Sequence, residues 1–348
     1  MNPNPTRYVP HQDGLDENSS PQSRSPTKLK AEMHISDSAS TLLDHVGNTP
    51  LLHLTRTGSL PKGVQLYAKA EFLNPSGSVK DRAARAMLLD AIESSRLVEG
   101  KTIVDATSGN TGIAYATWGR VLGFPVELFL PSNTSPERKQ ILKALGSILQ
   151  ETDALEGSDG AYLAAKAAAK ANPEKYFYPD QYNNPANARA HFLGTGREIW
   201  EQTKGRVTHF ITGLGTSGTF TGVARRLKKE NPAIRTIAQQ PASPLHGIEG
   251  TKHLGTTIKP GILDEQYIDE IVTVTTEEAY EATRRLASDE GLFVGVSSGA
   301  NISAALKLAA TVPAGSLIVT VLCDSGTRYL SDPFWDEGSE TEKKGASS

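Results

Sequence analysis

The hydrophobic residues of this chain follow two spacings that alternate along most of its length. Short runs rich in Val, Ile and Leu predict strands, and amphipathic or Ala-rich segments between them predict helices. Strands are expected at Val64–Leu73, Thr102–Ala106, Val126–Leu130, Ser147–Gln150, Val207–Thr212, Thr236–Gln239, Glu270–Val274 and Leu317–Leu322. Helices are expected at Ala83–Leu97, Gly112–Leu122, Pro136–Leu145, Gly160–Ala171, Ala188–Thr203, Thr219–Glu230, Glu277–Glu290 and Ala300–Ala310.

This alternation predicts an α/β fold in which mostly parallel sheets are flanked by helices. In such sheets ligands bind beyond the carboxyl ends of the strands, where a loop leads into a helix. The 348 residues exceed one typical domain, so two domains are expected. Residues 1–40 and 332–348 lack a hydrophobic period, and we expect both to be disordered tails.

Composition excludes several function classes. The formal net charge of −3 argues against nucleic acid or an anionic membrane as the main partner. The single cysteine, Cys323, excludes an internal disulfide and favours a reducing compartment. No apolar run reaches the roughly 18 residues needed to span a bilayer, and the first residues contain no apolar signal core. We therefore expect a cytoplasmic protein, without a metal site because the histidines lack metal-ligand spacing.

The first candidate for chemistry is Lys80, which follows the turn Asn74–Gly77 and lies in the first turn of a predicted helix. Ser76 or Ser78 could cap that helix. The positive end of the helix dipole disfavours a cation at this place, and a partly neutral lysine can attack a carbonyl to form an imine. The alternative, an ordinary solvated lysine, is far more common for a lysine considered alone.

Two further loops lie between a strand and a helix. Thr107–Gly112 directs backbone N–H groups at a helix start, which suits a carboxylate, although an ordinary capped turn explains the same residues. Gly213–Thr219 can direct amides and hydroxyls at a phosphate, with a structural turn as an equal alternative. The glycine spacing of dinucleotide sites and the lysine of a P-loop are absent, so a compact phosphate monoester fits better.

Two smaller features complete the set. Gly295–Gly299 begins another predicted helix, and a hydroxyl there could cap the helix or meet a ring nitrogen. Cys323 ends the last predicted strand, where a cysteine is most often a small buried residue.

The four motifs around Lys80, Thr107–Thr111, Gly215–Thr219 and Gly295–Gly299 resemble, in this order, the cysteine synthase family. Members of this family are pyridoxal-phosphate enzymes of fold type II, the tryptophan-synthase-β-like fold. The resemblance runs from about residue 41 to 331. Within the family, the chain is most similar to the B-type bacterial enzymes in Lys80–Arg82, Ser135–Arg138, Cys323-Asp324 and Arg328–Ser331.

The resemblance implies a role for each motif. Lys80 is expected to carry pyridoxal 5'-phosphate as an internal aldimine, Asn110 to bond the pyridine 3-oxygen and Ser297 to meet the pyridine nitrogen. The expected phosphate ligands are Gly215, Thr216, Ser217, Gly218 and Thr219. The expected ligands of the substrate α-carboxylate are Thr107, Ser108, Gly109, Thr111 and Gln181.

The resemblance also implies domains and partners. Residues 41–73 and 185–331 would form a larger cofactor-binding domain, and 74–184 a smaller mobile domain that closes over the substrate. Family members are usually homodimers, and some dock the C-terminal peptide of serine acetyltransferase. Both partners are therefore expectations for this chain.

The implied activity is a β-replacement. A neutral hydroxyl opposite the ring nitrogen makes the cofactor a weak electron sink, which suits elimination of a good β-leaving group. Lys80 would remove the α-proton, and a sulfur nucleophile would add to the resulting aminoacrylate. The expected enzyme is a cysteine synthase that converts O-acetyl-L-serine and sulfide to L-cysteine and acetate.

Three alternatives remain. The segment His246–His253 lacks the arginine pair of some B-type members. Cystathionine β-synthase, or another β-replacement enzyme using phosphoserine, serine or thiosulfate, has the same core motifs. A cofactor-free binding protein could retain the fold, whereas the glycine spacing disfavours a dinucleotide-dependent oxidoreductase.

Overall fold

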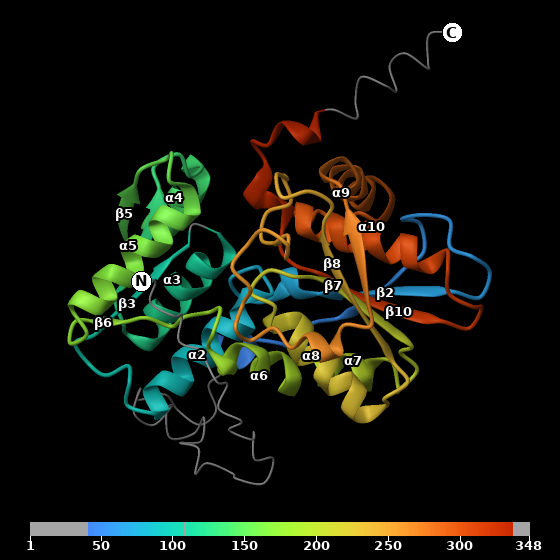
Figure 1. The fold of residues 1–348 in the computed structure, drawn as a ribbon, viewed down its shortest axis with the longest axis horizontal. Coiled ribbons are helices and arrows are strands. Elements are labelled where there is room, and N and C mark those ends of the chain that lie inside the picture. Colours follow the sequence, from blue (N-terminus) through green and yellow to red (C-terminus); the bar gives the residue numbers. More distant parts are fainter. Residues whose placement is uncertain (1–40, 108, 337–348) are drawn as a thin grey trace, which may run out of the picture. The chain divides into compact units, whose positions relative to one another are not determined.

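The structure, a computed structural model, describes residues 41–107 and 109–336. Its larger sheet has six strands in the order β1-β2-β10-β7-β8-β9 (Figure 1). These strands are β1 (Leu51–Leu54), β2 (Gln65–Ala70), β7 (His209–Gly213), β8 (Arg235–Pro241), β9 (Glu270–Val274) and β10 (Leu317–Leu322). The edge strand β1 runs antiparallel to β2, and the other neighbouring pairs are parallel.

The smaller sheet has four parallel strands in the order β5-β4-β3-β6. They are β3 (Thr102–Ala106), β4 (Val126–Pro131), β5 (Ile148–Thr152) and β6 (Tyr176–Phe177). The predicted α/β class with two mostly parallel sheets is confirmed. All strands of the smaller sheet come from residues 102–177, and those of the larger sheet come from both sides of this segment.

Helices flank both sheets. They are α2 (Lys80–Glu93), α3 (Asn110–Leu122), α4 (Pro136–Ala144), α5 (Gly157–Ala171), α6 (Pro185–Leu193), α7 (Thr195–Gln202), α8 (Gly218–Glu230), α9 (Thr276–Glu290) and α10 (Val296–Ala309). Short 3-10 helices lie at Leu42–His45, Glu71–Leu73, Glu265–Tyr267, Gly326–Tyr329 and Pro333–Trp335. Helix α2 packs against both α3 and α6.

The central strand β10 shows why the larger sheet needs helices on both faces. Alternate residues of a strand point to opposite faces, and all six residues of β10 are buried. Ile318 and Leu322 belong to the core formed with α9 and α10, whereas Val319 and Val321 belong to the core formed with α7 and α8. Figure 1 shows these helix pairs on opposite sides of the sheet. Val319 of β10 lies opposite Tyr67 of the neighbouring strand β2 and opposite Phe210 of the other neighbour, β7.

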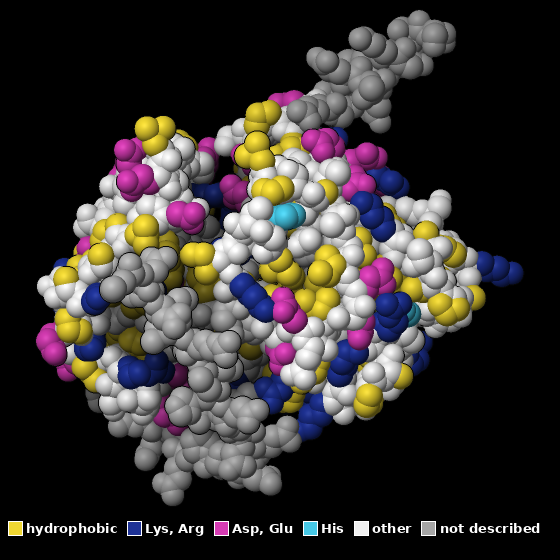
Figure 2. Space-filling view, viewed as in Figure 1, with side chains coloured by type: hydrophobic (Ala, Val, Ile, Leu, Met, Phe, Trp, Pro, Cys, Tyr) yellow, Lys and Arg dark blue, Asp and Glu magenta, His cyan; other side chains and the backbone are white. Residues whose placement is uncertain are grey.

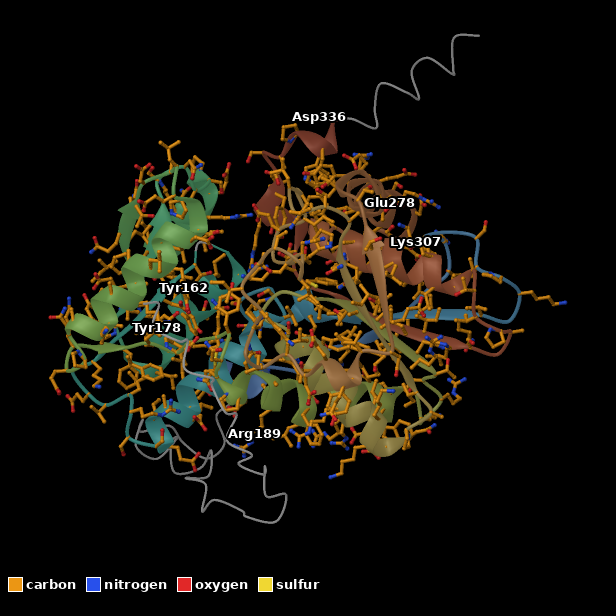
Figure 3. The ribbon with its side chains drawn as sticks, viewed as in Figure 1. Tyr162, Tyr178, Arg189, Glu278, Lys307 and Asp336 are labelled. Carbon is orange, nitrogen blue, oxygen red and sulfur yellow. The ribbon has the colours of Figure 1, made fainter. Side chains whose placement is uncertain are left out.

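On the outer face, α9 and α10 are joined by an ion pair. Lys307 Nζ of α10 lies 2.7 Å from Glu278 Oε1 of α9 (Figure 3). Both side chains are more than a third exposed, so solvent screens the pair and its contribution to stability is small. The buried apolar contacts between the helices therefore dominate their packing.

One predicted helix was wrong. Residues 188–203, expected to form a single helix, belong to α6 and α7, which are separated at Gly194. Gly194 has φ −104° and ψ −89°, outside the helical region. A Cβ at this position would lie 2.9 Å from Ala190 O and 2.9 Å from Arg82 Nη1. The lack of a side chain at Gly194 thus leaves room for the Arg82 guanidinium, a contact that periodicity alone does not reveal.

Several element ends also differ from the predictions. Helix α10 begins at Val296, so the predicted loop Gly295–Gly299 is mostly the first turn of the helix. Helix α2 begins at Lys80 with Val79 as its N-cap residue, so neither serine occupies the predicted cap position. Residues 71–73 form a 3-10 helix instead of extending β2. The short strands β1 and β6 were not predicted, because four and two residues leave little period to detect.

The predicted tails lie mainly beyond the described residues, which exclude 1–40 and 337–348. Residues 332–336 are described, and Phe334 among them is buried and stacked on the Tyr280 ring. No described helix is long and apolar enough to cross a membrane. Over the described residues, no group of three or more His, Cys, Asp or Glu side chains could hold a metal ion. Figure 2 shows acidic and basic side chains interspersed on the visible face.

Candidate active site

The loops that follow β7 and β10 meet the starts of α2, α3 and α10 around one pocket. Its lining consists of Val79, Lys80, Asn110, Thr212, Gly213, Gly215, Thr216, Ser217, Thr219, Gly250, Thr251, Ser297, Asn301, Val321 and Cys323. The predicted motifs around residues 80, 110, 215–219 and 297 are therefore together in space. None of these lining residues carries a carboxylate, so the pocket is suited to an anion.

Lys80 is held at the pocket by the backbone on either side of it. The amide of Val79 donates a 2.8 Å hydrogen bond to the carbonyl of Cys323, at the end of β10. Lys80 N lies 3.3 Å from Ser78 Oγ. Gly77 makes the preceding turn with φ +81°, a conformation that other residues adopt at a cost. The start of α2 is thus joined to the central strand of the larger sheet.

A buried ion cluster anchors the same helix. Arg82 Nε lies 2.7 Å from Glu71 Oε2, and Arg82 Nη1 lies 2.7 Å from Glu198 Oε1 of α7. Lys69 Nζ also lies 2.6 Å from Glu198 Oε2. Burial raises the pKa of Glu198, but hydrogen bonds and charge from Arg82, with Lys69, lower it overall to about 2. Glu198 is therefore ionised at neutral pH, and Lys80 is next but one to a strongly paired arginine.

The loop Gly213–Thr219 has the features of an anion cradle. Helix α8 begins at Gly218, so the N–H groups of its first turn have no partner within the helix. Ser217 adopts φ +69°. This backbone conformation is uncommon for residues other than glycine, and residues that adopt it cluster at functional sites. Its hydroxyl is buried and has no hydrogen-bond partner in the described structure. A Cβ on Gly215 would meet Gly250 O at 2.2 Å, so only glycine allows this approach.

Two residues outside the pocket lining hold the threonines of this loop. Asn187 Nδ2 of α6 donates to Thr216 Oγ1 at 3.1 Å. His191, also of α6, has Nε2 3.3 Å from Thr219 Oγ1 and Nδ1 3.0 Å from Thr195 Oγ1. Burial, together with the charge of Arg82, lowers the pKa of His191 to about 3. The imidazole is therefore neutral at physiological pH.

Asn110 begins α3 and is oriented by a residue that the sequence pattern did not single out. Its Nδ2 donates to Asp324 Oδ2 at 2.7 Å, and the hydroxyl of Tyr329 donates to the same oxygen at 2.6 Å. Burial and the charge of Asp324 raise the pKa of Tyr329 well above its ordinary value, which keeps the phenol protonated. Among the described residues, the second amide hydrogen of Asn110 has no partner, so it can donate to a ligand.

The predicted carboxylate site is partly assembled. Thr111 Oγ1 donates to Gln181 Oε1 at 2.9 Å, so these two predicted residues are in direct contact although they lie in different segments. Thr107 and Gly109 flank the start of α3 beside them. Ser108 lies outside the described residues. The pocket lining includes Asn110 but not the four described residues of this predicted site, which lie next to it: Thr107, Gly109, Thr111 and Gln181.

Ser297, Asn301 and Cys323 also line the pocket. Asn301 Nδ2 donates to Val321 O at 2.8 Å, and Asn301 Oδ1 accepts from Gly213 N at 2.8 Å. Asn301 thus fixes α10 to the ends of β7 and β10. Burial raises the pKa of the Cys323 thiol to about 11, so it is not a thiolate at neutral pH. Ser297, in the first turn of α10, offers a neutral hydroxyl.

The segment that departs from the arginine pair lies at the pocket edge. Gly250 and Thr251 line the pocket. Glu249 forms an ion pair with Arg138 of α4, and Arg138 also lies 5.4 Å from the centre of the Tyr329 ring. Lys252 Nζ lies 4.6 Å from the centre of the Tyr182 ring. The negative charge of Glu249 and the positive charge of Lys252 therefore each have a partner in the protein.

Sequence reasoning missed Asn187, His191, Asn301 and Asp324. Asn187 and His191 face inward from a helix whose other residues give no functional signal, and the loop threonines that they contact lie 29 and 28 residues away. Asp324 was noted only as part of the Cys323-Asp324 pair, without a role of its own. A buried asparagine or aspartate in a helix or at a strand end is the one local sign that could have identified Asn187, Asn301 and Asp324.

These residues fit pyridoxal phosphate. Lys80 supplies an amine for the aldehyde, the first turn of α8 and the unpartnered Ser217 hydroxyl suit the dianionic phosphate, and Asn110 has a free donor. The absence of a carboxylate from the described lining leaves the phosphate without a repelling neighbour.

Comparison with known proteins identifies the same chemistry. The model of the pyridoxal-phosphate dependent enzyme family matches residues 42–324. The cysteine synthase of Aquifex aeolicus is 52% identical over 302 residues, 85% of this chain and 92% of the relative. Cysteine synthase B of Salmonella typhimurium is 39% identical over 297 residues, 85% of this chain and 96% of the relative.

A solved structure agrees with these relatives. The crystal structure of O-acetyl serine sulfhydrylase isoform 3 from Entamoeba histolytica matches with a TM-score of 0.81 and 37% identity, covering 86% of this chain and 92% of that one. The chain therefore belongs to the pyridoxal-phosphate dependent enzyme family, and within it to the cysteine synthases.

Proposed function

We propose that this enzyme converts O-acetyl-L-serine and sulfide to L-cysteine and acetate, with Lys80 as its catalytic residue. The observation that carries the proposal is the single pocket in which Lys80, Asn110 and the 215–219 loop converge. The similarity to the cysteine synthases of Aquifex aeolicus and Salmonella typhimurium, each over 85% of this chain, supports the proposal.

The pocket and the family resemblance together support an assignment of the cofactor-holding residues. Gly215, Thr216, Ser217, Gly218 and Thr219 would bind the phosphate, Asn110 the ring oxygen and Ser297 the ring nitrogen. When bound, pyridoxal phosphate withdraws electrons from the substrate α-carbon. A neutral Ser297 hydroxyl keeps that withdrawal weak, which favours departure of a β-substituent such as acetate.

Lys80 would move the proton that the reaction requires. Its amine, freed when the substrate amine takes its place, lies in the pocket and can accept the proton from the substrate α-carbon. Thr111 and Gln181 would hold the substrate carboxylate, aided by the positive N-terminal end of α3. A fixed carboxylate orients the Cα–H bond toward the lysine.

Closure is a further part of this proposal. Residues 74–184 would form a smaller domain that closes over the substrate, because Asn110, Thr111 and Gln181 all belong to it while the phosphate loop belongs to the larger domain. Closure would exclude water that competes with sulfide for the reactive carbon. The Asn110–Asp324 hydrogen bond would then be a contact between the two proposed domains.

Cellular context is also proposed by family likeness. A homodimer is the usual state of the family, and serine acetyltransferase is a partner of some members. The single cysteine supports a reducing compartment, for which the cytoplasm is the proposed location. Light scattering, with and without the C-terminal peptide of serine acetyltransferase, measures both associations.

Borohydride reduction tests the role of Lys80. Reduction of the cofactor-loaded enzyme followed by peptide mapping should place the pyridoxyl group on the peptide containing Lys80. Lys80→Ala should bind the cofactor without a covalent link, whereas Lys62→Ala, at an exposed position, should behave as wild type. Attachment to any other lysine would refute the assignment.

A substrate panel distinguishes the remaining activities. Acetylserine, phosphoserine and serine are offered with sulfide, thiosulfate or homocysteine, and rapid-scan absorbance follows each reaction. We expect acetylserine with sulfide to give the highest kcat/KM. A preference for homocysteine would instead identify cystathionine β-synthase activity, and failure to bind the cofactor at all would identify a binding protein.

A further inference from the structure

Asn187 occupies a place between the two anion sites of the proposed enzyme. It is 2% exposed, and its Nδ2 lies 2.8 Å from the carbonyl oxygen of Gln181 and 3.1 Å from Thr216 Oγ1. Gln181 belongs to the carboxylate site, and Thr216 belongs to the phosphate loop. One side-chain nitrogen therefore contacts both sites.

The orientation of this amide follows from its partners. A backbone carbonyl only accepts hydrogen bonds, so the atom 2.8 Å from Gln181 O must be the nitrogen and not the oxygen of the amide. The same nitrogen uses its second hydrogen toward Thr216 Oγ1. Both amide hydrogens of Asn187 are thereby committed, one to each site.

This arrangement sets the direction of the Thr216 hydroxyl. A hydroxyl has one hydrogen and accepts through its oxygen. Because Thr216 Oγ1 accepts from Asn187, its own hydrogen is left to donate into the pocket that Thr216 lines. A phosphate dianion only accepts hydrogen bonds, so it requires that direction.

Close packing keeps Asn187 in place. A Cβ on Gly218 would lie 2.0 Å from Asn187 Oδ1, so the asparagine lies directly against the first residue of α8. Helix α6, which carries Asn187, packs against α8. The amide therefore has little room to turn away from Thr216.

We propose that Asn187 is a positioning residue that aims the Thr216 hydroxyl at the cofactor phosphate and, through the Gln181 carbonyl, couples the phosphate site to the substrate carboxylate site. The inference rests on the proposed function, because it needs a phosphate at the 215–219 loop. Asn187 itself touches neither ligand: it acts through Thr216 and Gln181.

Binding of inorganic phosphate tests the first half of this role. Calorimetric titration of the full chain, freed of cofactor, compares wild type with Asn187→Ala, Asn187→Asp and Thr216→Val. We expect Asn187→Ala and Thr216→Val each to bind phosphate about tenfold more weakly, the loss of one hydrogen bond to a charged group. Asn187→Asp should bind still more weakly, because it accepts instead of donating and repels the anion.

A double variant shows whether the two residues act together. If Asn187 acts through the Thr216 hydroxyl, Asn187→Ala should add no loss of phosphate affinity in the Thr216→Val background. Asn172→Ala, an exposed asparagine at the end of α5, is the matched control and should bind phosphate as wild type does. Wild-type phosphate affinity in Asn187→Ala, or fully additive losses, would overturn the inference.

Steady-state kinetics test the second half. In cofactor-saturated enzyme, Asn187→Ala should raise KM for O-acetylserine several-fold with a smaller change in kcat, because Gln181 loses its support. Asn172→Ala, the exposed control, should leave that KM at the wild-type value. Equal KM values in all variants would overturn the coupling.

The two proposals fail in different ways. If wild type binds no pyridoxal phosphate, the proposed function is wrong. If wild type binds it and Asn187→Ala binds phosphate equally well, only the role of Asn187 is wrong. Should Asn187→Ala not fold, the shape-conserving Thr216→Val and Asn187→Asp still decide between these outcomes.

Discussion

Asn110 donates its side-chain amide to Asp324 Oδ2 at 2.7 Å, across 214 residues of sequence. Asp324 is fully buried, and its Oδ2 also accepts from the Tyr329 hydroxyl at 2.6 Å. The bond joins the start of α3 to the turn after β10. The protein itself therefore orients the Asn110 side chain, without a contribution from a ligand.

Removal of the Asp324 carboxylate should loosen this arrangement. Asp324→Ala leaves the Asn110 amide and the Tyr329 hydroxyl without their buried acceptor, which should lower the free energy of unfolding by about 2 kcal/mol. Urea denaturation measures the loss of stability. A change in the absorbance of the bound cofactor would show that Asn110 has lost its orientation. Asp289→Asn, in a partly exposed pair with Arg285, should change stability by less than about 0.5 kcal/mol. Equal effects of the two substitutions would contradict the prediction.

The ion cluster of α2 gives a larger stability effect. Arg82→Met leaves Glu71 and Glu198 buried without their main partner, and we expect the free energy of unfolding to fall by about 3–5 kcal/mol. Arg197→Met is the control, because its pair with Glu201 is exposed. Thermal unfolding of the cofactor-free and cofactor-loaded forms measures both. A Tm for Arg82→Met within a degree of wild type would disprove the role of the cluster.

The third prediction concerns the close contact between Gly215 and the Gly250 carbonyl oxygen. Gly215→Ala would place a Cβ 2.2 Å from the carbonyl oxygen of Gly250, and backbone atoms cannot yield as a flexible side chain can. We expect overpacking to cost about 1–3 kcal/mol and to displace the phosphate loop, so that cofactor affinity falls. Fluorescence titration with pyridoxal phosphate measures this affinity. In Gly255→Ala the nearest atom is the movable His253 ring at 3.1 Å, and no change is expected.

The buried His191 predicts a pH dependence of stability. Its pKa is about 3 in the folded protein and about 6.5 when unfolded. Between these values only the unfolded chain binds the proton, so stability is complete above pH 6.5 and falls as the pH decreases toward 3. From pH 7 to pH 5 this residue should remove about 2 kcal/mol.

Variants isolate the contribution of His191. His191→Gln should flatten the pH dependence of urea unfolding over that window, whereas His53→Gln, at an exposed position, should retain it. The same slope in wild type and His191→Gln would show that other groups govern the acid sensitivity.

Local sequence determined much of the fold because each element carries its own period. The buried run of β10 and the amphipathic α9 were found within a residue or two of their observed bounds. The motifs around Lys80 and residues 215–219 were found for a related reason, since a turn between a strand and a helix needs glycine and hydroxyl residues in a short stretch. The roles of these residues in binding stay predictions.

Only tertiary structure decided which distant side chains meet. Asn187 gained its importance from two partners, one of them 29 residues away, and Asp324 from a partner 214 residues away. Gly194, where α6 and α7 separate, lies against an arginine from another helix. Hydrophobic periodicity reports which face of an element is buried, but a hydrogen bond between buried polar groups depends on how two elements pack, and that packing is a property of the whole chain.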